Sequence, residues 1–101
     1  MKKLFISQPM NGKADEEILA ERKVAIKAAE ELLREPVEVI DSFFQSAPVG
    51  AKPLWFLGKS LELLSDADDI AYFAKDWQKA RGCKIEHECA VEYGIPRIEH
   101  A

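Results

Sequence analysis

Short apolar segments alternate with longer amphipathic segments along the chain, and this alternation limits the fold more than any other feature. Strands that alternate with helices of this length form βαβ units, whose strands run parallel in a sheet covered by helices on both faces. We therefore predict an α/β protein. The expected strands are residues 3–7, 37–41, 69–74 and 95–99, and the expected helices are residues 14–33, 53–65 and 82–94.

Length and composition narrow the class of protein further. The chain has 101 residues, which predicts a single domain over residues 1–101, and its hydrophobic content of 48% is too high for a disordered chain. The net charge is −4 with both signs mixed along the sequence, which argues against a nucleic-acid surface. The sequence lacks an apolar run of membrane-spanning length and an apolar N-terminal signal. We expect a cytoplasmic protein without a membrane partner.

Polar residues follow the predicted strands at the edge where parallel α/β sheets bind ligands. That edge lies beyond the carboxyl ends of the strands, where the strand order reverses. The candidate binding residues at this edge are Ser7, Gln8, Pro9, Met10, Asn11, Gly12, Asp41, Asp76 and Gly82. Residues 7–12 also fit an ordinary turn between a strand and a helix, and both interpretations stay open.

Glu86 occupies an unusual position on the third predicted helix. At about 100° per residue, the apolar side chains gather on one arc, and Glu86 falls inside it. The predicted members of this buried arc are Ile85, Cys89, Ala90 and Tyr93. Burying an ionised carboxylate costs free energy unless a partner group pairs with it or the charge has a function. The free backbone N–H groups of the helix turn after Gly82 favour a negative charge. Glu86 is therefore a candidate nucleophile or ligand of a substrate hydroxyl.

Several common cofactor motifs are missing from the sequence. It contains no GxGxxG fingerprint, no Walker sequence and no Cys/His quartet with zinc spacing, so we expect no metal and no cofactor. We interpret Cys83 and Cys89 as reduced thiols. His87 and His100 have no evident companion in the sequence, and we assign them no role.

Three further features allow more than one interpretation. Ser60 either bonds back to its own helix or projects toward the binding edge. Arg22 interrupts the apolar stripe of the first predicted helix. Its position is consistent with a side chain at the edge of that stripe, with a contact to another subunit or with a bound ligand. Aromatic side chains are dense around residues 42–52, and they suit either stacking on a base or a subunit interface. These are Phe43, Phe44, Trp55 and Phe56. We expect a homo-oligomer, most simply a dimer.

Three motifs together resemble those of the nucleoside 2-deoxyribosyltransferase superfamily, in particular its short phage and bacterial members. The segment of residues 7–10, Ser-Gln-Pro-Met, resembles the family's loop after the first strand. Ala67 and Asp68 match a pair before its third strand, and residues 82–90 match its Gly-x-x-x-Glu signature. The resemblance covers nearly the whole chain. It implies a small flavodoxin-like three-layer sandwich with a four-stranded, mainly parallel sheet.

The resemblance also implies an activity, namely cleavage or transfer at the N-glycosidic bond of a nucleoside or nucleotide. Glu86 stands in the place of the nucleophile, and Ser60 stands where the family has an aspartate that protonates the base. Gln8 and Asn11 would contact the base or sugar, Ser60 the 5′ group, and Asp41 or Asp76 would supply a proton. The alternative is a non-catalytic nucleotide-binding or oligomeric assembly module with the same fold.

Overall fold

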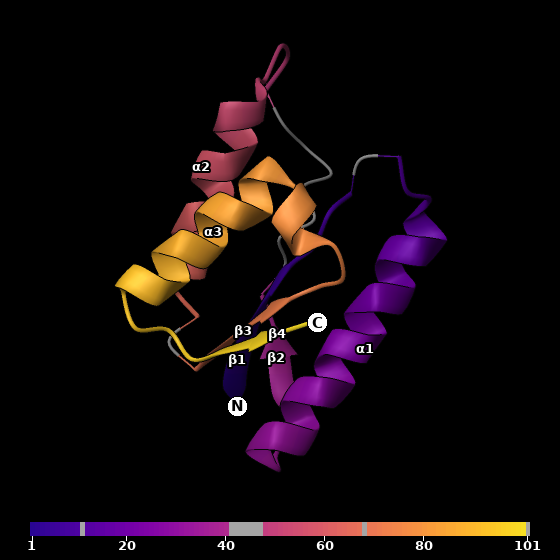
Figure 1. Cartoon of the computed structure of the whole chain (residues 1–101), viewed down its shortest axis with the longest axis vertical. Coiled ribbons are helices and arrows are strands. Elements are labelled where there is room, and N and C mark those ends of the chain that lie inside the picture. Colours follow the sequence, from indigo (N-terminus) through magenta and orange to yellow (C-terminus); the bar gives the residue numbers. More distant parts are fainter. Residues whose placement is uncertain (11, 41–47, 68, 101) are drawn as a thin grey trace.

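The computed structural model describes residues 1–10, 12–40, 48–67 and 69–100. They form a parallel four-stranded sheet with helices on both faces, as Figure 1 shows. The strands are β1 (Lys2–Ser7), β2 (Val37–Val39), β3 (Ile70–Phe73) and β4 (Arg97–Glu99). The α-helices are α1 (Asp15–Leu33), α2 (Pro53–Leu64) and α3 (Arg81–Glu92), and a short 3₁₀ helix, η1, spans Trp77–Lys79.

The strand order is β2-β1-β3-β4, and all three pairings are parallel. This is the order of the first four strands of a flavodoxin-like sheet, so the predicted fold class is confirmed and the sheet is wholly parallel. The chain leaves β1 toward β2 on one side and later returns to β3 on the other. The strand order therefore reverses between β1 and β3, at the expected ligand-binding position.

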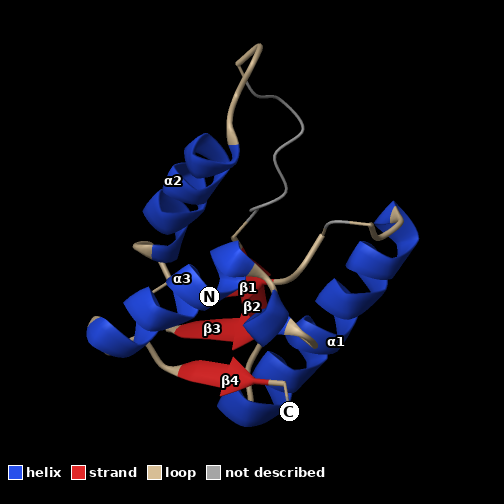
Figure 2. Cartoon of the chain, turned by 45° about the horizontal axis from the view of Figure 1, so that its top comes forward, coloured by secondary structure: helices blue, strands red, loops and turns tan. Residues whose placement is uncertain are grey.

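Alternation along β1 builds the two halves of the core. Leu4 and Ile6 pack with Ala25 and Ala29 of α1. Phe5 points to the opposite face, where the core cluster includes residues of α2, β3 and α3. Figure 2 shows α1 on one side of the sheet and α2 with α3 on the other. The three-layer arrangement follows because successive side chains of the strand point to opposite faces of the sheet, and helices cover both faces.

The buried arc of the third predicted helix differs from the prediction at two residues. On α3 the buried residues are Cys83, Glu86 and Ala90, whereas Ile85 and Tyr93 are exposed. The predicted arc was therefore wrong at Ile85 and Tyr93, because small Cys83 and Ala90 let the helix approach the sheet on the neighbouring arc. On α1 the same preference for small residues buries Ala25 and Ala29. The larger Leu19 and Leu32 of the same helix are exposed.

No helix in the described ranges is both long and apolar enough to cross a bilayer.

Candidate functional site

The centre of the site joins the end of β1 to α3. The Ser7 hydroxyl donates a hydrogen bond of 2.7 Å to Oε1 of Glu86, across 79 positions of sequence. Both side chains are buried, with 2% and 7% of their surface exposed. The bond lies at the carboxyl end of β1, where the strand order reverses. Two residues that the sequence placed at the same edge are thus in direct contact.

Helix α2 contributes a second hydroxyl to the same carboxyl group. Burial raises the pKa of Glu86, and hydrogen bonds from Ser7 and Ser60 act in the opposite direction. Ser60 is half-buried, and its effect on Glu86 favours the interpretation that it projects toward the binding edge. The two hydroxyls favour the ionised form, which is the form that a nucleophile requires.

The helix dipole has a smaller role than the sequence suggested. Helix α3 begins at Arg81, so Glu86 lies in its second turn. The free N–H groups belong to the first turn, and the dipole effect falls off over the same distance. The compensation for burying this carboxylate therefore comes from serine hydroxyls rather than from the helix terminus.

Gln8 faces the other side of the sheet and ties the end of β1 to α1. Its amide nitrogen donates to the Ile18 carbonyl at 3.1 Å and to Glu21 Oε2 at 3.3 Å. Its carbonyl oxygen accepts from Arg22 at 3.5 Å, and Lys13 pairs with the second oxygen of Glu21 at 2.5 Å. Both amide protons thus have protein partners, and Gln8 holds the loop after β1 in place.

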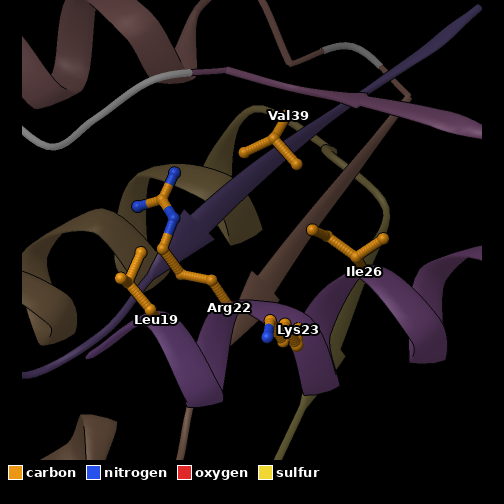
Figure 3. Close-up of a pocket in the computed structure, with 5 residues that line it drawn as sticks. All are labelled: Leu19, Arg22, Lys23, Ile26 and Val39. Atoms are coloured by element: carbon orange, nitrogen blue, oxygen red, sulfur yellow. The ribbon is translucent and has the colours of Figure 1, made fainter. Parts of the chain in front are cut away.

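A cavity lies beside this network, between α1 and β2. Its volume is about 380 Å³. Figure 3 shows its lining residues, four from α1 and one from β2: Leu19, Arg22, Lys23, Ile26 and Val39. A second cavity of about 400 Å³ lies between α2 and α3 and is lined by Leu61, Leu64, Ser65, Cys89, Tyr93 and Ile95. Glu86 lines neither of these two cavities.

The remaining predicted residues divide into four groups. Pro9 and Met10 are half-buried in the loop after β1, and Gly12 adopts a φ of 76° that favours glycine. Gly82 lies in the first turn of α3, where an added Cβ would come 4.0 Å from Leu57.

Asp76 is exposed and pairs with Lys79 at 3.6 Å, which directs its carboxylate toward η1. Asn11 and Asp41 lie outside the described residues, as do Phe43, Phe44 and Asp68.

Sequence reasoning missed two features of this edge. Cys83 is buried on α3 three residues before Glu86, and burial raises the pKa of its thiol to about 11. His87, to which we assigned no role, has a companion: its Nε2 pairs with Glu99 at the end of β4, and its ring stacks on Trp77 with centroids 4.1 Å apart. The pairing follows from the parallel register of β3 and β4, which places Glu99 beside Phe73. Helical phase alone gives no signal for it.

No group of three potential metal ligands occurs within residues 1–10, 12–40, 48–67 and 69–100. Comparison with protein-family models gives one finding, a match over residues 2–98 to a domain of unknown function, DUF4406. The chain belongs to this family. Neither the curated proteins nor the solved structures provide a match.

Proposed function

We propose that this protein cleaves or transfers the N-glycosidic bond of a nucleoside or nucleotide, with Glu86 as nucleophile. The observation that carries the proposal is a buried carboxylate held by two serine hydroxyls at the carboxyl edge of a parallel sheet. A buried carboxyl group whose ionised form is favoured by hydroxyl donors is suited to attack an anomeric carbon and to stabilise a cationic transition state. The motif resemblance adds independent support for this class of substrate.

The reaction would proceed in two steps. An oxygen of Glu86 forms a bond to C1′ while the C1′–N bond breaks, and the electron pair of that bond leaves with the base nitrogen, which takes up a proton. Water or a second base then attacks C1′ and releases the carboxylate, as in retaining glycosidases. Ser7 and Ser60 position the carboxylate before the first step, and they interact with it again after the second step releases it from the sugar.

The competing function is a nucleotide-binding or assembly module without turnover. The observation that favours it is Ser60, a residue that cannot act as an acid near neutral pH, in contact with the carboxylate.

A thermal-shift screen of nucleosides and nucleotides, followed by chromatography of each stabilising compound for free base, separates the two functions. The proposal predicts both stabilisation and free base. Stabilisation without free base would support the binding module, and neither effect would contradict both.

A further inference from the structure

Helix α1 presents a row of charged and apolar side chains to solvent. Leu19 is 58% exposed, and Glu16 and Lys23 are exposed one helical turn before it and one turn after it. Side chains three or four positions apart on a helix are neighbours, so these three residues form one row. Asp15 and Arg22 border the same row. We call these five residues the α1 stripe.

The cavity between α1 and β2, of about 380 Å³, lies beside the α1 stripe and shares three of its residues, Leu19, Arg22 and Lys23. Figure 3 shows the Arg22 side chain extending from α1 into the space between Leu19 and Val39. The cavity thus combines apolar walls with two cationic side chains. This lining suits a carboxylate carried on a partner surface that is otherwise apolar.

The charges of the α1 stripe are arranged symmetrically about Leu19. Asp15 and Glu16 lie four and three positions before Leu19, and Arg22 and Lys23 lie three and four positions after it. A second α1 that packs antiparallel, with a two-fold axis at Leu19, therefore places the acidic pair of each copy opposite the basic pair of the other. Such self-complementarity is what a two-fold interface between identical chains requires.

The stripe has charges that the described part of the chain does not neutralise. Neither Glu16 nor Lys23 forms an ion pair among the residues that the structure describes. In Figure 2, α1 is the α-helix of the described residues that covers its side of the sheet. A second helix can therefore lie along the stripe.

We propose that the α1 stripe is the contact between two copies of this chain, which pack antiparallel about a two-fold axis at Leu19. Glu16 pairs with the partner's Lys23, Asp15 pairs with the partner's Arg22, and the two leucine side chains meet at the axis. Each pair occurs twice, and the antiparallel helix dipoles add to the attraction. The acidic residues of each copy lie over the cavity of the other. The proposal concerns assembly alone and does not depend on the proposed function.

The first test exchanges the charges of the exposed pair and measures dimer dissociation by sedimentation equilibrium of the full chain. Glu16→Lys places lysine opposite lysine, and Lys23→Glu places glutamate opposite glutamate. Each variant alone should dissociate about tenfold more readily than the wild type, since two ion pairs change from attraction to repulsion. An equimolar mixture of the two variants should form a heterodimer of nearly wild-type affinity, because all its pairs again have opposite sign.

The matched control is Glu31→Lys, which makes the same change of charge at an exposed position of α1 outside the stripe. It should leave the dissociation constant unchanged. The mixture also shows that both single variants are folded, because only folded chains can restore the dimer. A monomeric wild type, or a mixture that associates no better than its components, would overturn the proposal.

The second test removes the apolar centre of the contact. Leu19→Ala should weaken the dimer about tenfold, because a largely exposed leucine on each copy loses the apolar surface that the contact buries. Leu32→Ala is the matched control, since Leu32 lies on the same helix and is 63% exposed, close to the value for Leu19. Equal dissociation constants for these two variants would overturn the proposal.

Discussion

Glu86 is a buried carboxylate whose charge is stabilised by hydroxyl groups. Its neighbours Ser7 and Ser60 come from β1 and α2, far from α3 in sequence, and they meet only because the parallel sheet brings the strand end and both helices to one edge. Helical phase predicted the burial of Glu86, and the general rule for parallel sheets predicted its proximity to Ser7. The direction of the hydrogen bonds required the structure.

Substitution of Glu86 by glutamine should raise thermal stability near neutral pH. The folded-state pKa of Glu86 is raised, so its favourable contribution is present below the unfolded-state pKa and is lost as pH rises through the folded value. The glutamine variant avoids this loss, so its melting temperature should exceed that of the wild type at neutral pH, and the gap should close as pH falls toward 4.

Melting curves of both proteins across this pH range check the prediction. Glu88→Gln removes an exposed charge from the same helix and is the matched control. A gap that is independent of pH, or equally large for Glu88→Gln, would contradict the assignment of Glu86 as the strained carboxylate.

Ser60→Asp should accelerate base release. An aspartate in contact with Glu86 would share one proton with it, because two carboxylates at short range cannot both ionise readily. The leaving base would then have a proton donor, and a positioned acid is worth roughly 10²–10⁴-fold in rate. Initial rates measured by chromatography should therefore rise. Ser60→Asn has nearly the same shape without the acid, and equal rates for the two variants would show that the proton comes from elsewhere.

At the scale of elements, the structure shows how small side chains set helix phase. The sequence predicted all three α-helices and four strands with ends that differ by a few residues, because strand and helix periods are strong local signals. It misplaced Tyr93, which follows the last residue of α3 and is 83% exposed, because hydrophobicity alone does not tell which arc can approach a sheet closely. The helix arcs that approach the sheet closely contain the buried residues Ala25, Ala29 and Ala90.

Helix α1 begins without a side-chain cap, and a serine there should stabilise it. Ala14 has the extended backbone of an N-cap, with φ −72° and ψ 154°, and Glu17 stands three residues later as in a capping box. Ala14→Ser should add about 1 kcal/mol to the free energy of unfolding, or about 4–8 °C in melting temperature. Ala20→Ser, at an exposed position within α1, should lower stability slightly. Equal melting temperatures for the two variants would exclude the cap.

The whole molecule presents several large apolar side chains to solvent. Leu19, Leu32 and Leu54 are 58%, 63% and 75% exposed, and Phe56 is partly exposed beside Trp55. Sequence patterns place such residues on helices without telling whether a single domain can cover them, and this domain has a thin core. The overall architecture was predictable from alternation, whereas the distribution of uncovered apolar surface required the structure.

These exposed side chains support the prediction of a homo-oligomer, most simply a dimer. Burying them between two copies would remove apolar surface from water at no cost to the fold. Sedimentation equilibrium over a micromolar concentration series should give about twice the mass of one chain. A single-chain mass throughout the series would contradict the prediction.

The central claim is that Glu86 forms a covalent bond to the sugar, and mass spectrometry tests it most directly. A nucleoside with fluorine at C2′ should accumulate the intermediate, because the electron-withdrawing substituent slows the second step that releases the sugar. Compounds that release base are incubated in this fluorinated form, and the protein is then digested and its peptides are fragmented. We predict one added sugar on Glu86 in the wild type and in Glu88→Gln, and none in Glu86→Gln. Base release without any sugar adduct on Glu86, or an adduct on another residue, would contradict the account.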